Sequence, residues 1–348
     1  MNDYSVPDAD AAEVAFRRGA RILVTRLRYL GDALLSLPLV AALRRALPEC
    51  ELHYMAEPGP IELLREQREI DVRWRVDRGA WPALRLVSQL RAQRFAAVID
   101  LFCNPRSALL VRATGARIRI GEDRRLRRHA YTLARRLVPG RSAIDQHLDA
   151  LRGLSLPVPP PERPVLRLSE AEIDSGERRW QHLGAGPRLV VHLAATQPAK
   201  EWPTALAVEL VHDLARRGFA VALSSAPHRP ATSAEVAEAA GKAAVLLPVL
   251  PLRELLGVVQ AAAGVVAVDG AIAHAAVALG RPTVALFGPT DPRVWFPYSP
   301  FGPYRVLHAG VDCGDCDRRQ CPERRCMRAI APDTVRATLL EILSGEPS

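Results

Sequence analysis

Short apolar segments of the chain are followed by single polar residues that could perform acid–base or phosphate chemistry. After residues 21–27 comes Gly31-Asp32, whose carboxylate could act as a general base if a hydroxyl group came within hydrogen-bond reach. An ordinary helix N-cap is the simpler interpretation of the same aspartate. After residues 188–193 a polar loop leads to Lys200, and its compact ammonium group suits phosphate in a chain whose only other lysine is Lys242.

A third polar residue, Asp269, follows residues 264–268 and begins the run Asp269-Gly270-Ala271 ahead of an apolar helix. The free N–H groups at a helix start bind anions, so this turn is a second candidate phosphate site. His274, one turn further on, is by default a packed or capping histidine and only secondarily a functional one. Residues 287–292 form another strand end whose turn residues could face the same crevice.

The elements that must carry these residues are predicted by alternating apolar runs and helical spacing. Strands are expected at 21–27, 51–55, 96–101, 117–120, 188–193, 219–224, 244–247, 264–268 and 283–287. Helices are expected between them, for example at 81–94, 204–217, 252–262 and 272–279. Pro38 either kinks a helix over 34–47 or opens it after Ser36. The alternation predicts an α/β protein with two doubly wound parallel sheets, whose ligands bind at the carboxyl ends of the strands.

A proline-rich stretch separates the two predicted domains. Residues 1–156 form an N-terminal domain, of which 1–19 are expected to be a flexible tail. Residues 157–187 contain the five prolines of the run LPVPPPERP (156–164) and an entry helix, and are predicted to form a semi-rigid linker. Residues 188–331 form the C-terminal domain. Residues 332–348 contain a terminal helix that could pack back on the N-terminal domain.

Composition and charge narrow the class of protein. The chain has 348 residues, of which 49% are hydrophobic, so it can bury two cores and is not intrinsically disordered. No apolar stretch approaches the ~18 residues that a membrane span needs, and residues 1–13 lack a signal pattern, so a cytoplasmic location is expected. The net charge of +9 lies almost entirely in the first 150 residues, above all in the arginines between Arg124 and Arg141. An anionic partner or a merely solvated arginine-rich surface would both explain this excess.

Four segments, taken in order and spacing, resemble glycosyltransferase family 9, the ADP-heptose lipopolysaccharide heptosyltransferases. They are ILVTRLRYLGDALLSLPLVAALRRALP (22–48), IDLFCNPRSALLVRATGARIRIG (99–121), AATQPAKEW (194–202) and VDGAIAHAAVALGRPTVALFGPTDP (268–292). The resemblance extends over roughly residues 21–343 and is strongest to the heptosyltransferase III-like branch. It implies the GT-B arrangement, in which two Rossmann-like domains face a central crevice.

The resemblance also implies an activity and a role for individual residues. An inverting enzyme would move a heptose or related sugar from an ADP-sugar to the inner core of lipopolysaccharide, with Asp32 as the general base. It implies no catalytic cofactor, and peripheral work at the cytoplasmic face of the inner membrane. No recognised fold or aromatic platform supports binding of nucleic acid. The residues at the matching donor positions are Thr196, Lys200, Asp269, Gly270, Ala271 and His274, and those at the acceptor positions are Arg28, Gly31, Asn104 and Arg106.

The chain departs from the family at two places, which keeps other functions open. The family usually has Asp-Ser/Thr-Gly where this chain has Asp269-Gly270-Ala271, so a hydroxyl group is lost. The family also often places a glutamate after the strand at 219–224, where this chain has no acid before Glu235. A sugar-nucleotide epimerase or phosphorylase of GT-B fold, or a non-catalytic glycolipid-binding protein with a decayed donor site, are therefore the alternatives.

Four of the six cysteines are clustered near the C-terminus. Cys313, Cys316, Cys321 and Cys326 have the spacing of a zinc knuckle with cysteine in place of histidine, and four thiolates can close a tetrahedral structural site. Four arginines within the cluster would offset the charge of a zinc–thiolate site, but they equally suit phosphate or lipid. A structural zinc is therefore one of two interpretations.

Overall fold

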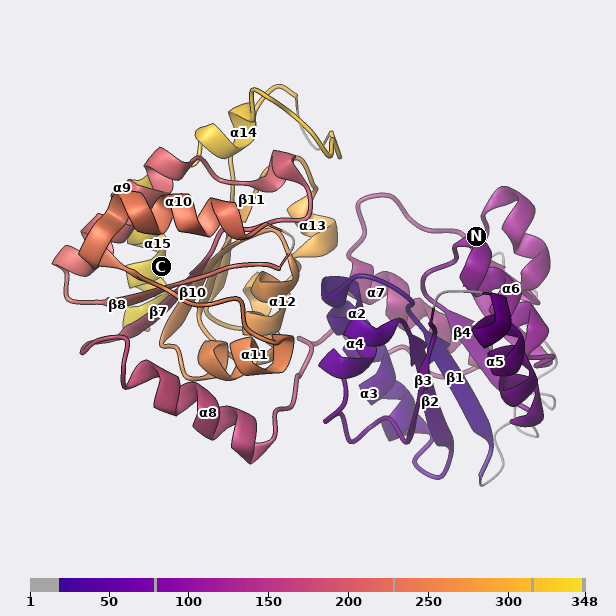
Figure 1. Cartoon of the computed structure of the whole chain (residues 1–348). Helices are drawn as coiled ribbons and strands as arrows, with labels where there is room; N and C mark the ends of the chain where they lie inside the picture. Colours follow the sequence, from indigo (N-terminus) through magenta and orange to yellow (C-terminus); the bar gives the residue numbers. More distant parts are fainter. Residues whose placement is uncertain (1–18, 78–79, 228, 314–315, 346–348) are drawn as a thin grey trace. The chain divides into compact units, whose positions relative to one another are not determined.

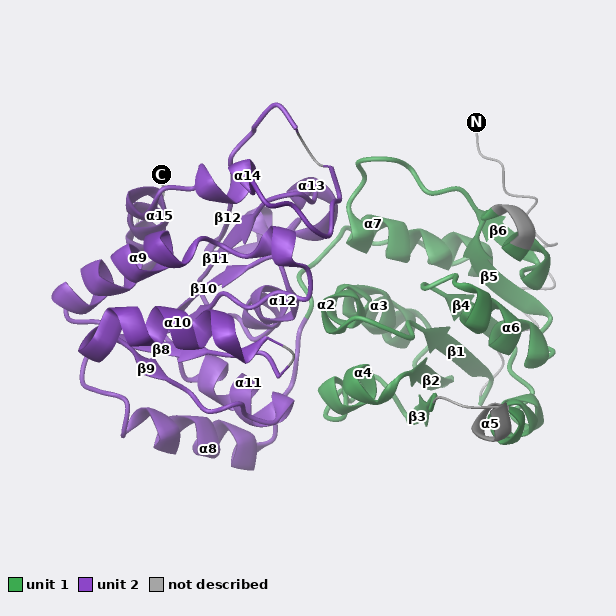
Figure 2. Cartoon of the chain, turned by 45° about the horizontal axis from the view of Figure 1, so that its top comes forward, with its two compact units in different colours: residues 1–164 green, residues 165–348 purple. Residues whose placement is uncertain are grey.

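The computed structural model describes residues 19–77, 80–227, 229–313 and 316–345, and the chain divides into two compact units (Figure 2). The N-terminal unit comprises residues 1–164 and the C-terminal unit residues 165–348. Apart from Gly19, the tail expected over residues 1–19 lies outside the described residues. The proline-rich segment predicted as a linker thus straddles the boundary, and its first part is grouped with the N-terminal unit.

The N-terminal unit is built on a parallel sheet of six strands in the order β3-β2-β1-β4-β5-β6 (Figure 1). The strands are β1 (Arg21–Thr25), β2 (Glu51–Ala56), β3 (Val72–Arg75), β4 (Ala97–Asp100), β5 (Ile118–Glu122) and β6 (Leu133–Arg135). The α-helices are α2 (Leu30–Leu35), α3 (Leu37–Ala46), α4 (Pro58–Leu63), α5 (Ala80–Ala92), α6 (Pro105–Ala113) and α7 (Ala143–Leu148). Two 3₁₀ segments, Arg125–Ala130 and Asp149–Leu154, complete the unit.

The C-terminal unit repeats this plan with the order β12-β11-β10-β7-β8-β9. Its strands are β7 (Arg188–His192), β8 (Ala220–Ser224), β9 (Val245–Leu246), β10 (Gly264–Val268), β11 (Thr283–Phe287) and β12 (Tyr304–His308). Its helices are α8 (Glu170–Trp180), α9 (Thr204–Arg216), α10 (Pro230–Ala240), α11 (Leu252–Gln260), α12 (Ala271–Ala278), α13 (Pro292–Trp295), α14 (Arg325–Arg328) and α15 (Pro332–Ser344). No helix within the described ranges is long and apolar enough to cross a membrane.

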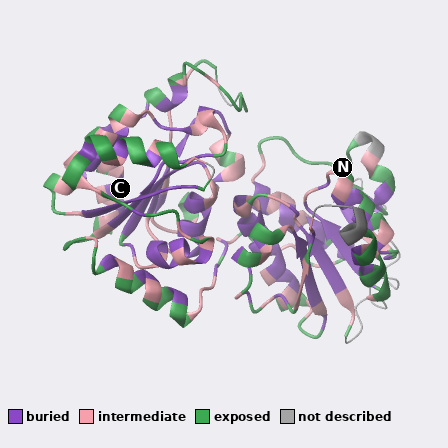
Figure 3. Ribbon diagram, in the orientation of Figure 1, coloured by how far each residue is buried: buried purple, intermediate pink, exposed green. Residues whose placement is uncertain are grey.

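Strand order fixes where a ligand can bind in each unit. Both sheets have the order typical of Rossmann folds, in which the chain reverses direction between the first and fourth strands of the unit. The central strands are buried on both faces, as their uniform colour in Figure 3 shows. The reversal points are β1/β4 and β7/β10, and the loops that leave these strands diverge to opposite faces, opening a space at the carboxyl edge.

The helical run after β1 is broken in two. Pro38 lies in the first turn of α3, so it opens a second helix after Ser36 and does not kink a continuous one. The hydroxyl group of Ser36 donates to the carbonyl of Ala33 at 2.6 Å and contacts the hydroxyl group of Tyr54 at 2.9 Å. The break therefore leaves α2 as a short helix of its own, anchored to β2.

The entry helix α8 is fixed tightly to α11. A Cβ atom at Gly176 would lie 2.1 Å from the carbonyl oxygen of Gly257, so the two backbones touch. The indole of Trp180 donates to the Val258 carbonyl at 2.9 Å. Glu172, in a capping box with Ser169 at the start of α8, forms a buried two-pronged pair with Arg253 at 2.7 and 2.6 Å. Helix α8 is therefore part of the C-terminal unit.

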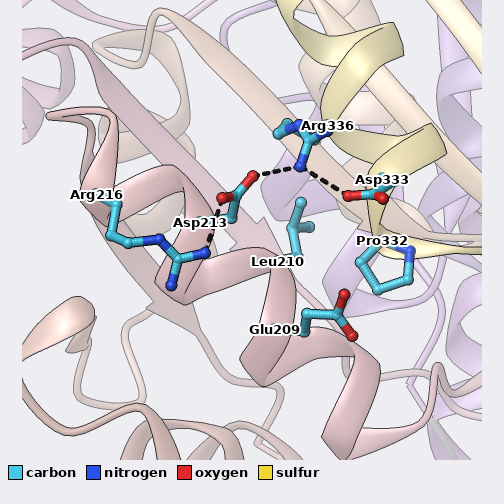
Figure 4. A pocket seen from close by; sticks show the side chains of 7 residues that line it. All are labelled: Glu209, Leu210, Asp213, Arg216, Pro332, Asp333 and Arg336. Atoms are coloured by element: carbon cyan, nitrogen blue, oxygen red, sulfur yellow. Dashed lines mark hydrogen bonds and ion pairs between the residues drawn. The ribbon is translucent and has the colours of Figure 1, made fainter.

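The terminal helix α15 packs on the core of its own unit, and the expectation that residues 332–348 could also pack on the N-terminal domain stays a prediction. Helix α15 contacts α9 and strands β10, β11 and β12, because Val335, Leu339 and Ile342 join the C-terminal core. A pocket between α9 and α15 is lined by charged residues that pair with one another (Figure 4). Arg336 donates to Asp213 at 2.6 Å and to Asp333 at 2.7 Å. These pairs connect α15 to α9.

Candidate active site

Asp32 lies in the first turn of α2, at the β1/β4 reversal point of the N-terminal sheet. It is not the N-cap of this helix, because that position belongs to Tyr29. The Asp32 carboxylate is partly buried, and its Oδ2 atom is paired with the guanidinium group of Arg26, the residue that follows β1. Asp32 therefore does not have the N-cap role that was the simpler interpretation.

Arg26 is itself held by contacts with the turn after β4. Its guanidinium group donates to the Leu101 carbonyl and lies 5.1 Å from the centre of the Phe102 ring. That turn is fixed by Asp100, whose Oδ1 atom accepts from the N–H groups of Phe102 and Cys103, each at 2.9 Å. Burial raises the pKa of the Asp100 carboxyl group, against the hydrogen bonds that it accepts. The turn after β4 thus orients the Arg26–Asp32 pair.

The expected acceptor residues fall into two groups. Arg28 and Arg106 meet on one oxygen of Glu57, at 3.1 and 3.3 Å. Asn104 instead caps α6, where its side chain accepts from the Ser107 N–H at 2.7 Å in a complete capping box. Gly31 is buried within α2. The structure therefore brings Arg28 and Arg106 together, whereas the amide of Asn104 is engaged in a structural role.

In the C-terminal unit, Lys200 and Asp269 meet at the β7/β10 reversal point. The ammonium group of Lys200 lies 2.5 Å from Oδ2 of Asp269, although 69 residues separate them. The hydroxyl group of Thr290, which comes from the loop after β11, donates to the same oxygen at 2.5 Å. The side chain of Asp269 is only 6% exposed and that of Lys200 is 15% exposed. Asp269 thus orients the ammonium group at the carboxyl edge of three adjacent strands, β7, β10 and β11.

Helix α12 starts beside this pair, and the backbone conformation at its start does not require glycine. Gly270 caps α12 with an extended backbone (φ 176°), which any residue adopts, and a Cβ atom there would meet only the Val268 carbonyl at 3.7 Å. Ala271 is the first residue of α12, whose first-turn N–H groups have no partner within the helix. The exposed Thr196 lies in the loop after β7. The hydroxyl residue typical of the family would therefore fit at position 270.

His274 is placed among aromatic side chains. It is buried, its Nδ1 atom lies 3.0 Å from the hydroxyl group of Tyr298, and its ring packs near Phe296. Tyr298 and Phe296 in turn pack edge to face, with ring centres 4.8 Å apart. His274 therefore packs within α12 against aromatic side chains, and its role in donor binding stays a prediction.

Comparison with known proteins identifies the family. The sequence profile of glycosyltransferase family 9 (heptosyltransferase) matches residues 83–326. The chain belongs to this family. Lipopolysaccharide heptosyltransferase 1 of Pseudomonas aeruginosa is 32% identical over 331 residues, covering 86% of this chain and 87% of the relative. Lipopolysaccharide heptosyltransferase 3 of Escherichia coli is 27% identical over 289 residues, covering 78% and 85%.

Solved structures confirm the fold of this glycosyltransferase. The E. coli ADP-heptose heptosyltransferase II matches with a TM-score of 0.77 and 23% identity, over 94% of this chain and 100% of that one. The predicted GT-B class of two Rossmann-like domains is therefore confirmed. Membership of this heptosyltransferase family makes the chain a glycosyltransferase as a class of enzyme.

The cysteines of this glycosyltransferase do not converge on a metal site among the residues described. No three His, Cys, Asp or Glu side chains in those ranges are grouped so that they could hold an ion. Cys313 and Cys316 are exposed, whereas Cys326 is buried in the core, where burial raises the pKa of its thiol. The structural zinc therefore stays a prediction, which metal analysis of the purified protein would check.

Three residues of the two sites were not singled out from the sequence. Arg26 and Glu57 each follow a strand at the same edge as Asp32, and this position was the signal that could have found them. Thr290 lies in the segment 287–292, which was expected to face the donor crevice, although no residue of it was chosen. Their importance arises from contacts with residues of other loops.

Proposed function

We propose that this glycosyltransferase moves a heptose or a related sugar from an ADP-sugar to the inner core of lipopolysaccharide, with inversion at the anomeric carbon. The observation that carries the proposal is the placement of one carboxylate and one ammonium group. Asp32 lies at the reversal point of the N-terminal sheet, and Lys200 lies at that of the C-terminal sheet. These are the positions at which ligands bind in such folds.

In the proposed reaction Asp32 removes the proton of an acceptor hydroxyl group. The resulting oxygen attacks the anomeric carbon of the donor, and the bond from that carbon to the diphosphate oxygen breaks. The departing ADP carries negative charge, which the ammonium group of Lys200 and the N–H groups at the start of α12 stabilise. No catalytic metal is required in this scheme, because a cation and backbone dipoles supply the electrostatic stabilisation.

Substitution of the two groups tests the assignment. Asp32→Asn should abolish transfer while ADP binding stays near that of the wild type. Asp71→Asn is the matched control, because Asp71 is also paired with an arginine, Arg44, but precedes β3 at the opposite edge of the sheet. Lys200→Ala should weaken ADP binding, and Lys242→Ala should not. Turnover by Asp32→Asn would remove Asp32 from the role of base, and unchanged ADP affinity in Lys200→Ala would remove Lys200 from the donor site.

Two further measurements separate this reaction from its alternatives. Incubation with ADP-sugar alone should leave the donor intact, whereas an epimerase or phosphorylase would release an altered sugar or a sugar phosphate. Calorimetry should detect binding of ADP, which a decayed site would not bind. The anomeric configuration of the product, read by NMR, tests inversion.

We place the reaction at the cytoplasmic face of the inner membrane, with the basic N-terminal unit toward the anionic acceptor. Two of the arginines expected to make this contact form ion pairs within their own unit. Arg124 pairs with Glu122 at 2.5 Å, and Arg141 pairs with Asp149. Sedimentation with anionic vesicles tests whether the contact forms.

A further inference from the structure

Part of the cysteine-rich end of the chain lies against the loop that carries Lys200. We call residues 316–330 the arm, which includes α14. The carbonyl oxygen of Arg319 in the arm accepts a hydrogen bond from the Ala199 N–H at 3.2 Å. Ala199 directly precedes Lys200 in the 3₁₀ turn Pro198–Lys200. The arm thus holds the backbone immediately before the residue that bears the ammonium group.

A second contact holds the backbone immediately after Lys200. The guanidinium group of Arg324, the residue before α14, donates to the Glu201 carbonyl at 3.3 Å and lies 3.9 Å from the Glu201 carboxylate. That carboxylate is 9% exposed and is also paired with Arg229 at 2.6 Å, so it keeps a cation when Arg324 is changed. Arg324 has a φ of 41°, a left-handed conformation that is uncommon for a residue other than glycine. Such a conformation persists where surrounding contacts hold it, and those of Arg324 lead to Glu201.

The arm also holds the loop after β11, which carries Thr290. The Asp317 N–H donates to the carbonyl of Pro289, the residue before Thr290, at 2.8 Å. Thr290 and Lys200 both donate to the carboxylate of Asp269. These two partners of Asp269 therefore stand on loops whose backbones contact the same arm.

The arm is itself fixed to the core of the C-terminal unit. Cys326 and Met327 are buried, and a Cβ atom at Gly288 would lie 2.6 Å from the Met327 sulfur. The indole N–H of Trp202 donates to the Ile330 carbonyl at 3.1 Å. Helix α14 also contacts β11. An arm anchored in this way can keep the two loops in one fixed position.

We infer that Arg324 is a positioning residue of the donor site, which acts on ADP binding through Lys200. The arm fixes the backbone around Lys200, so that the ammonium group is in place before the diphosphate arrives. A group that is ordered in advance spares the binding step the entropy cost of ordering a loop. The inference rests on the proposed function in one respect, that Lys200 binds the donor. It adds that the cysteine-rich end of the chain serves the donor site by holding its loops.

A double-mutant cycle on ADP binding tests this inference. Calorimetry on the full chain should show that Arg324→Gln lowers the affinity for ADP about fivefold, as expected for one charged hydrogen bond whose donor is 29% exposed. In the background of Lys200→Ala the same substitution should change the affinity by less than about twofold, because the group that Arg324 positions is gone. Arg325→Gln is the matched control. Arg325 is the next residue, is 62% exposed and pairs with Glu323 at 3.2 Å, so its loss should leave ADP affinity unchanged.

Hydrogen exchange measures the hold on the loop in the absence of any ligand. The Ala199 N–H, which the Arg319 carbonyl protects, should exchange faster in Arg324→Gln than in the wild type. In Arg325→Gln it should exchange at the wild-type rate. The melting temperature of both variants should stay close to that of the wild type, because the Glu201 carboxylate keeps its second cation.

The results separate this inference from the proposed function. Wild-type ADP affinity or wild-type exchange of Ala199 in Arg324→Gln, or an equal loss of affinity in Arg325→Gln, would overturn the inference alone. A loss in Arg324→Gln that adds in full to that of Lys200→Ala would also overturn it, because Arg324 would then act independently. Normal ADP binding by Lys200→Ala would remove both the donor site and the inference. If the cycle shows the coupling while Asp32→Asn still turns over, the inference stands and the assignment of the base fails.

Discussion

The ion pair between Lys200 and Asp269 should be visible as a thermodynamic coupling. We consider three variants of the full chain: Lys200→Met, Asp269→Asn and the double substitution. Lys200→Met leaves a carboxylate that is 6% exposed, and its one remaining side-chain partner among the described residues is the hydroxyl group of Thr290. Removal of one member of a buried pair costs about 3–5 kcal/mol, and we expect about 3 kcal/mol here because the ammonium group still reaches water.

Asp269→Asn removes the negative charge but keeps an oxygen that can accept one hydrogen bond, so we expect a smaller loss of about 2 kcal/mol. The double variant has no uncompensated charge, and it should be more stable than the sum of the single losses predicts by about 2 kcal/mol. For a unit of this size, a loss of 3 kcal/mol lowers the melting temperature by roughly 6–12 °C. Urea unfolding of the three variants and the wild type measures the coupling.

The same variants connect stability with ligand binding. In Asp269→Asn the ammonium group has lost its internal counter-ion, so ADP should raise the melting temperature of this variant more than it raises that of the wild type. In Lys200→Met the shift caused by ADP should largely disappear. Losses of stability that add within about 0.5 kcal/mol would refute the ion pair. An ADP shift that is unchanged in both variants would refute the proposed use of Lys200.

Two other predictions concern α8, and one concerns the start of α12. Burial alone would raise the pKa of Glu172, but hydrogen bonds from Arg253 and from the start of α8 lower this pKa from 4.5 to about 2. The stabilisation that Glu172 contributes is therefore complete above pH 4.5 and is lost as the pH falls toward 2. Urea unfolding at pH 5 and pH 3 should show this loss in the wild type but not in Glu172→Gln. Gly176→Ala should destabilise the C-terminal unit by about 3 kcal/mol because its Cβ atom would collide with the Gly257 carbonyl, and a normal melting temperature would disprove that contact. Gly270→Ser should leave the melting temperature unchanged or raise it by a degree or two, since the side chain has room and can cap α12; a clear loss would show that glycine is required there.

The fold was predictable where strands are buried and apolar. Strands β10 and β11 begin and end as expected, because each is a run of branched or apolar residues between turn signals. Strands β3 (VRWR), β6 (LAR) and β12 (YRVLH) were missed. Strands β3 and β12 mix charged and apolar residues at the edges of their sheets, and β6 has only three residues. Edge strands of this kind lack the continuous apolar pattern that marks a central strand.

The candidate sites were predictable as positions but not as contacts. Asp32 and Lys200 could be chosen because each follows a buried strand, at the edge where ligands of parallel sheets bind. The pairing of Lys200 with Asp269 and Thr290 joins residues 69 and 21 positions apart and depends on which strands are neighbours. The role of Asn104 as a cap could be read from the pattern Asn-Pro-Arg-Ser, since serine at the third helical position completes the capping box.

The repeated strand order allows a comparison of the two halves position by position. The segment that follows the first strand of each sheet carries a carboxylate in one unit, Asp32, and an ammonium group in the other, Lys200. Each of these groups is neutralised by a neighbour of opposite sign, Arg26 in the first case and Asp269 in the second. Two sheets with the same strand order therefore carry groups of opposite charge at equivalent positions. Exchange of a few loop residues, with both sheets left intact, is the shortest route by which such a chain could change its chemistry.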